Sequence, residues 1–279
     1  MAAASEGGLD VLTLDAPLVE QVLHAFIVNE VRKQGFERVV VGLSGGIDSA
    51  LSCILAAQAL GPEQVLAIRM PYRSSSADSL DDADAVIEAT GVESLTVDIS
   101  PQVDAYFETR TDADRMARGN KMARERMAIL YDHSSVHSAL VLGTSNKTEL
   151  LLGYGTIHGD MASAINPIGD LYKTQVRQIA RHVGVPEPIL QKPPSADLWS
   201  GQTDEEEMGF TYEIVDQVLF HLVDRRLPPG EVGGFDPALV QRVGDQVRRS
   251  QFKRSLPIIA KISHRTIGRD FRYARDWGA

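Results

Sequence analysis

Residues 38–50 have the sequence RVVVGLSGGIDSA, and this stretch decides the fold. The β-branched run at 39–41 predicts a short buried strand, and the small residues from Ser49 onward predict a helix. Between them lies a tight turn with Gly45 and Gly46, which lack a Cβ and let backbone N–H groups come close to a ligand. The following helix directs the positive end of its dipole at the same turn. The stretch therefore predicts an anion site suited to phosphate groups.

An aspartate, Asp48, follows the two glycines. Its carboxylate would repel bare phosphate unless a Mg²⁺ ion bridges carboxylate and phosphate oxygens. The turn lacks the Lys-Ser/Thr of a Walker A loop and the G-x-G-x-x-G spacing of a dinucleotide site, and Ser44 is not in a hydrolase elbow. The turn therefore predicts a metal–nucleotide complex, although a glycine pair by itself is equally typical of a simple chain reversal.

The composition restricts the class of protein. The chain has 279 residues, of which 43% are hydrophobic, enough for a large core. A single cysteine, Cys53, excludes a disulfide framework and a cysteine-based zinc site. The formal net charge of −10 argues against a nucleic-acid scaffold. No secretory signal or long apolar segment is evident, so we expect a soluble cytoplasmic protein without membrane contact.

Strands and helices are predicted to alternate in the first half of the chain. This order predicts a parallel sheet with right-handed crossovers, whose ligand lies at the carboxyl ends of the strands. Residues 201–209, GQTDEEEMG, are expected to form a flexible acidic loop that is solvated or that orders over a substrate. Further strands are expected at 64–70, 93–98 and 138–142, and helices at 17–34, 77–90, 101–107, 112–131, 145–152, 171–183, 212–225 and 237–250.

A second polar turn follows the predicted strand at 138–142. Gly143 and Thr144 end this strand, and Glu149 lies one turn into the next helix. An acid in this place is a candidate metal ligand beside Asp48. An exposed helical glutamate is the commoner explanation, so the residues alone leave both interpretations open.

Five segments together carry a family resemblance: GLSGGIDS at 42–49, GTSNKTELLLGY at 143–154, PIGDLYKTQVRQIA at 167–180, KPPSADLW at 192–199 and GQTDEEEMGF at 201–210. In this order they resemble the ammonia-dependent NAD synthetases, which belong to the ATP pyrophosphatases. The resemblance implies an α/β protein with a parallel sheet flanked by helices, the Rossmann-like adenine nucleotide alpha hydrolase fold, and a helical C-terminal part. It implies one domain over 1–279, with a nucleotide-binding core at 17–200 and a loop, helices and basic tail at 201–279.

The resemblance also implies a two-step reaction. The nicotinate carboxylate of deamido-NAD attacks the α-phosphate of ATP, pyrophosphate leaves, and ammonia then displaces AMP from the acyl-adenylate to give NAD. ATP and Mg²⁺ are required, and the enzyme is expected to be a homodimer with the deamido-NAD site at its interface.

Glutamine-dependent relatives carry a nitrilase-like amidase before the synthetase part. About 35 residues precede the first strand here, so we expect free ammonia or a separate glutaminase subunit as the nitrogen source.

Matching motifs assign the expected site residues. Asp48 and Glu149 would hold Mg²⁺, and Asp48 and Lys173 would be catalytic. Deamido-NAD would contact Arg124, Asp160 and Lys253. The expected ATP contacts are Gly42, Leu43, Ser44, Gly45, Gly46, Ile47, Asp48, Ser49, Arg69, Thr144, Lys173 and Ser195.

The sequence departs from the family in the acceptor half. The common bacterial form has FTKYGDGGAD after the metal glutamate, whereas Ile157 and Ala164 stand here at the places of its lysine and final aspartate. Phe252 replaces a histidine. Asp160 or His158 would then substitute in holding the acceptor, or the acceptor is a different carboxylate. A nucleotide-binding protein without turnover is a third hypothesis, but it would not need both metal carboxylates.

Overall fold

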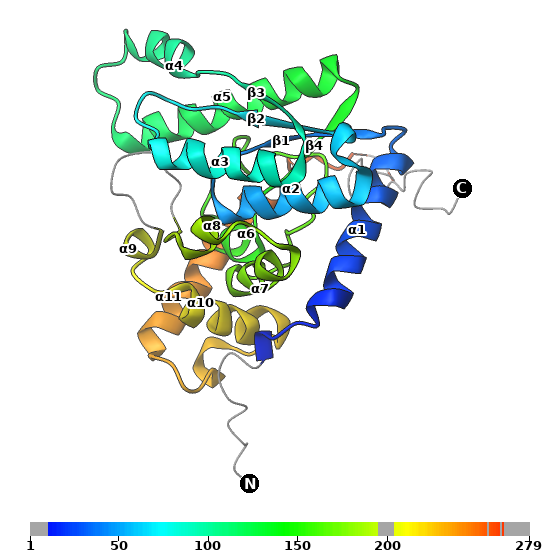
Figure 1. Ribbon diagram of the computed structural model, residues 1–279. Helices are drawn as coiled ribbons and strands as arrows, with labels where there is room; N and C mark the ends of the chain where they lie inside the picture. Colours follow the sequence, from blue (N-terminus) through cyan, green and yellow to red (C-terminus); the bar gives the residue numbers. More distant parts are fainter. Residues whose placement is uncertain (1–10, 195–203, 256, 263, 265–279) are drawn as a thin grey trace.

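The computed structural model describes residues 11–194, 204–255, 257–262 and 264. Within them a parallel four-stranded sheet is formed by β1 (Arg38–Gly42), β2 (Val65–Arg69), β3 (Glu93–Thr96) and β4 (Ala139–Leu142). The strand order is β3-β2-β1-β4. The sheet with its flanking helices confirms the predicted fold class (Figure 1).

Helices cover both faces of the sheet. On one face α2 contacts α1, α3 and α7, and on the other α5 packs on β1 and β4 with α4 beside it (Figure 1). A helical part containing α10 and α11 packs against α6 and α7. The helices are α1 (Ala16–Lys33), α2 (Ile47–Leu60), α3 (Ala77–Thr90), α4 (Ser100–Phe107), α5 (Arg115–Val136), α6 (Lys147–Leu152), α7 (Lys173–Val183), α8 (Glu187–Gln191), α9 (Asp204–Met208), α10 (Tyr212–Leu219) and α11 (Pro237–Arg249).

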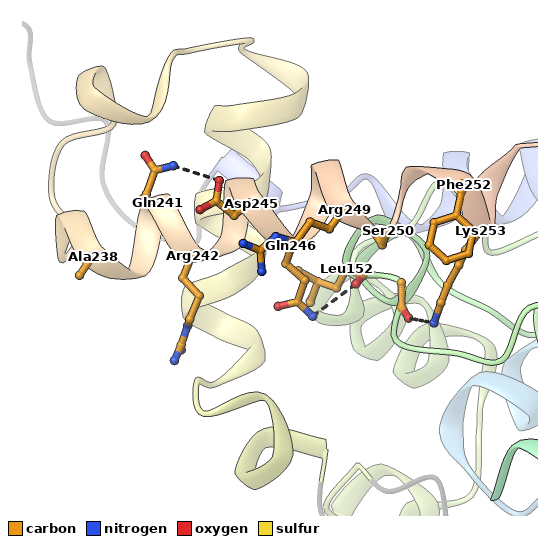
Figure 2. Close-up of a pocket in the computed structure, with 11 residues that line it drawn as sticks. Leu152, Ala238, Gln241, Arg242, Asp245, Gln246, Arg249, Ser250, Phe252 and Lys253 are labelled. Carbon is orange, nitrogen blue, oxygen red and sulfur yellow. Dashed lines mark hydrogen bonds between the residues drawn. The ribbon is translucent and has the colours of Figure 1, made fainter. Parts of the chain in front are cut away.

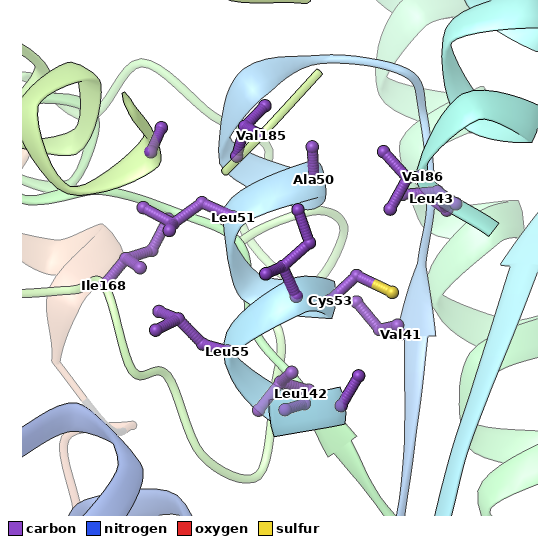
Figure 3. Packing of buried hydrophobic residues seen from close by; sticks show 14 of the residues in the cluster. Val41, Leu43, Ala50, Leu51, Cys53, Leu55, Val86, Leu142, Ile168 and Val185 are labelled. Carbon is purple, nitrogen blue, oxygen red and sulfur yellow. The ribbon is translucent and has the colours of Figure 1, made fainter. Parts of the chain in front are cut away.

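The valine run of β1 is buried because the sheet is covered on both faces. Successive side chains of a strand point to opposite faces. Val39 and Val41 belong to the apolar cluster under α2, and Val40 belongs to the cluster under α5. Figure 3 shows Val41 facing the α2 side chains, among them Cys53. Burial raises the pKa of the Cys53 thiol to about 12, so this thiol is an inert core group.

A separate apolar cluster holds the helical C-terminal part on α6. Tyr212, Val215 and Leu219 of α10 and Val240 of α11 are buried there against Leu152. This packing fixes α10 beside the starts of α6 and α7. No described helix is long and apolar enough to span a membrane.

Two predicted segments differ from the structure in their type of secondary structure, beyond shifts of a few residues at the ends of other elements. The sequence predicts a flexible loop at 201–209, yet Asp204–Met208 form α9. The carboxylate of Asp204 accepts hydrogen bonds from the hydroxyls of Tyr154 and Tyr212, each at 3.0 Å, and these long-range contacts order the segment. The single helix predicted at 212–225 is α10 followed by a wider π-helical turn at Phe220–Asp224.

Candidate active site

The candidate site lies where the strand order reverses. The chain runs outward from β1 through β2 to β3 and then returns to place β4 on the other side of β1. The loops that follow β1 and β4 therefore diverge at the carboxyl ends of neighbouring strands, which is where open α/β sheets bind ligands. A cavity of about 600 Å³ opens here, with Ser44, Met70 and Thr144 in its wall.

The loop after β1 is a preformed anion cradle. Gly45 has a φ of +82°, and a Cβ at this position would lie 2.2 Å from the backbone oxygen of Ser79, so only glycine fits. The hydroxyl of Ser49 donates to the carbonyl of Gly46 at 2.9 Å and accepts from the N–H of Ser44 at 3.2 Å. No side chain caps the start of α2. Its first N–H groups and its positive dipole end therefore remain available to phosphate oxygens.

Three helices bring an ion cluster to this cradle. Asp48 lies in the first turn of α2, Glu149 in α6, and Lys173 is the first residue of α7. The Lys173 ammonium donates to Oδ2 of Asp48 and, at 3.2 Å, to Oε1 of Glu149. Only 3% of the Lys173 side chain is exposed, against 16% and 17% for the carboxylates. Asn146 completes the cluster by donating from Nδ2 to Oδ1 of Asp48 at 2.9 Å.

A capping box explains why Glu149 points inward. Asn146 is the N-cap of α6, and its side chain accepts from the N–H of Glu149 at 3.0 Å. Glu149 returns a hydrogen bond through Oε2, which accepts from the N–H of Asn146 at 3.3 Å. Glu149 is therefore not an exposed helical glutamate, which was one of the two interpretations that the sequence left open. Asn146 is not among the residues predicted from the sequence, although the Asn-x-x-Glu spacing at 146–149 is a recognisable capping signal.

The cluster concentrates charge at a largely buried part of the cavity wall. Burial raises the pKa of Glu149, the Lys173 ammonium opposes this shift, and the Asp48 carboxylate adds to it. Burial by itself lowers the pKa of Lys173, but the two carboxylates outweigh it and raise the pKa overall. Lys173 therefore remains a cation, already bridging two carboxylates.

The carboxylates also fit a Mg²⁺ ion. Mg²⁺ prefers oxygen ligands and is commonly held by one or two protein carboxylates together with substrate phosphates and water. Asp48 and Glu149 supply two such oxygen groups that already converge on one cation, the Lys173 ammonium. Among the described residues no group of three or more acidic, histidine or cysteine side chains could hold a metal by itself. The remaining ligands would have to come from the nucleotide and water.

Most predicted ATP contacts meet at the cavity. Arg69 lines it while pairing with Asp84, and Ser195 lies outside the described residues. Gly45 and Ile47 are not in its wall; Gly45 sets the shape of the loop, and Ile47 is buried in the core under α2. The predicted residues in the wall are Gly42, Leu43, Ser44, Gly46, Asp48, Ser49, Arg69, Thr144, Glu149 and Lys173.

Two of the three residues predicted to contact the acceptor substrate lie at the cavity. Asp160 and Lys253 line the cavity. Lys253 donates to the carbonyl oxygens of Gly153 and Gly155, each at 2.8 Å, and so ties the C-terminal segment to the cavity wall. Arg124 is not in the wall; its Nε donates to a backbone carbonyl at 3.3 Å.

A second hollow of about 710 Å³ runs along α11 (Figure 2). Gly153 and Lys253 line both this groove and the cavity, so these two residues lie between the two spaces. Phe252 lines the groove and is 62% exposed.

A parallel sheet with a glycine cradle and a cation-bridged carboxylate pair at its switch point defines an α/β protein of the nucleotide-binding class. Residues 19–257 match the family model for NAD synthase, and the chain belongs to this family.

Individual relatives agree. The NH(3)-dependent NAD(+) synthetase of Trichlorobacter lovleyi is 59% identical over 96% of this chain and 98% of its own length. The structure of NMN synthetase from Francisella tularensis has a TM-score of 0.80 and 33% identity, covering 90% of this chain and all of the other. The NH3-dependent NAD synthetase from Campylobacter jejuni, in complex with nitrate, has a TM-score of 0.76 and 34% identity over 89% of this chain and all of the other.

Proposed function

We propose that the protein amidates deamido-NAD to NAD with ammonia, at the expense of ATP, and releases AMP and pyrophosphate. The observation that carries this proposal is the bridge from Lys173 to Asp48 and Glu149 directly beside the glycine cradle. The names of similar proteins supply the product, NAD, and the nitrogen donor, ammonia, and deamido-NAD is the acid whose amide is NAD.

The first step demands charge neutralisation more than a covalent nucleophile. The substrate carboxylate attacks the α-phosphate of ATP, so negative charge builds up on the departing pyrophosphate. The uncapped N–H groups at the start of α2 bind that pyrophosphate, and the Lys173 ammonium neutralises its charge. Asp48 and Glu149 would hold Mg²⁺, which when bound would screen the triphosphate from these carboxylates. Ammonia then displaces AMP, a good leaving group, from the resulting acyl-adenylate.

The acceptor contacts are part of the proposal. Asp160 and Lys253, both in the cavity wall, would contact deamido-NAD, and the groove along α11, which Lys253 also lines, would take its more distant part. Arg124 would contact it from outside the cavity wall. We also propose a homodimer in which this groove approaches the subunit interface.

A second candidate is the same reaction on a smaller acceptor. The resemblance places Ile157 and Ala164 where family members have contact residues, and the solved neighbour from Francisella tularensis is named an NMN synthetase. The deamidated form of NMN would occupy the cavity without needing the groove.

A paired acceptor assay tests both candidates. Purified protein is given ATP, Mg²⁺ and ammonium with either deamido-NAD or nicotinic acid mononucleotide, and pyrophosphate and amide product are quantified. The proposal predicts NAD formation with kcat/KM at least about tenfold higher for deamido-NAD, since the longer ligand gains contacts worth at least 1.4 kcal/mol. The reverse preference would replace it by the second candidate, and no amide from either acceptor would refute both.

A further inference from the structure

The start of α7 is held by groups from other helices. Lys173 and Thr174 are its first two residues, and their N–H groups need acceptors because the first turn of a helix has none within it. The N–H of Lys173 donates to the hydroxyl of Thr148 in α6 at 3.0 Å. The N–H of Thr174 donates to Oδ2 of Asp216 in α10 at 2.8 Å. The position of Lys173 is therefore set from outside α7.

A single carboxylate joins these two anchors. The Thr148 hydroxyl, which accepts from Lys173, donates in turn to Oδ1 of Asp216 at 2.5 Å. Asp216 and Thr148 are each 0% exposed. Thr148 directly precedes Glu149, so the same carboxylate fixes the first turn of α6 and the first turn of α7. Asp216 does not line the cavity and cannot touch a ligand there.

We propose that Asp216 is a positioning residue for the amidation: it holds the Lys173 ammonium and the Glu149 carboxylate in the relative places that the reaction needs. This inference rests on the proposed function. Side chains that orient charged site residues from behind typically affect catalysis tenfold to a hundredfold, since small displacements of reacting groups are costly. The helical C-terminal part thereby takes part in catalysis through one buried side chain.

The substitution Asp216→Asn removes one of the two accepting oxygens at nearly constant volume. Because Thr148 and Thr174 both donate to the aspartate, one hydrogen bond must be lost or reversed. Thr148→Val removes the hydroxyl that connects Lys173 to Asp216, and Thr148→Ser keeps it. The comparison of Thr148→Val with Thr148→Ser tests the positioning role even where Asp216→Asn fails to fold.

Asp224 offers a matched control. It also lies in the C-terminal part and accepts from Lys147 of α6, at 2.9 Å, and from the hydroxyl of Tyr172 before α7. It contacts neither Lys173 nor Thr148. Asp224→Asn therefore disturbs the same pair of helices without disturbing the proposed positioning contacts.

The experiment measures kcat and KM for ATP, deamido-NAD and ammonium, with thermal melting of each full-length variant. We expect Asp216→Asn and Thr148→Val to lower kcat about tenfold or more with little change in KM for deamido-NAD. Thr148→Ser and Asp224→Asn should keep kcat close to wild type even where melting falls. Equal losses in Asp216→Asn and Asp224→Asn, or a Thr148→Val variant with wild-type kcat, would overturn the inference.

A structural readout separates this inference from the proposed function. A wild-type protein that makes no amide refutes the function but leaves the geometry testable. In crystals of Thr148→Val, the distance from Lys173 Nζ to Glu149 Oε1 should increase from 3.2 Å, whereas Thr148→Ser should retain it. An unchanged distance in Thr148→Val would overturn the positioning role whatever the reaction.

Discussion

Replacing Gly45 by alanine tests whether the glycine cradle needs its observed shape. Gly45 has a φ of +82°, and an added Cβ would lie 2.2 Å from the backbone oxygen of Ser79. Ordinary contact requires a separation larger by about 1 Å, and a displacement of that size in a catalytic site costs on the order of a hundredfold in rate. The positive φ adds about 1–2 kcal/mol of backbone strain for alanine. We expect kcat/KM for ATP to fall roughly a hundredfold, together with a loss of stability.

Gly35 is the matched control for backbone strain. Its φ of +81° is almost the same, but a Cβ there meets nothing within 4 Å, and the residue lies in the turn between α1 and β1. Gly35→Ala should lose about 1–2 kcal/mol of stability in urea unfolding and keep wild-type kinetics. Equal kcat/KM for ATP in the two variants would refute the claim that the cradle itself is required.

Three further predictions concern single side chains. Asp48→Asn should abolish turnover while the thermal melting curve stays cooperative, and near-normal activity would remove Asp48 from the proposed metal site. Burial raises the pKa of Asp216 to about 6, so the folded state binds the proton of this carboxyl group more tightly than the unfolded state does. The stabilisation that this protonation gives the folded state is complete below about pH 4 and is lost as the pH rises through 6. Urea titrations should therefore show wild type losing up to about 3 kcal/mol relative to Asp216→Asn between pH 4 and pH 7, and a constant difference would contradict this. The Cys53 thiol, with its pKa raised to about 12 by burial, should react with a thiol reagent at pH 8 only at the rate of unfolding, and rapid labelling of the native protein would contradict its burial.

Local sequence signals predicted the sheet and its cradle because the physical causes are local. The valine run, the glycine pair and the small residues of α2 lie within 38–50, and the predicted limits of α3 at 77–90 are those observed. The predicted ends of helices that depend on capping residues were less accurate. The helix expected at 145–152 begins at Lys147, because Asn146 takes the N-cap position.

Contacts between distant residues could not be predicted. Asp216 is 68 residues from Thr148 and 42 from Thr174, and such pairs leave no periodic pattern in the sequence. The order of α9 likewise depends on Tyr154, 50 residues away from Asp204. Lys173, the ion-pair partner of Glu149, lies 24 residues away on another helix, so the sequence alone left the role of Glu149 open.

Identification of the nucleotide products tests the central claim most directly. Phosphorus NMR of a reaction with ATP, Mg²⁺, ammonium and deamido-NAD should show AMP and pyrophosphate appearing in equal amounts with NAD. ADP and inorganic phosphate in their place would show that the cradle does not serve attack on the α-phosphate, and the proposed roles of Asp48, Glu149 and Lys173 would be wrong.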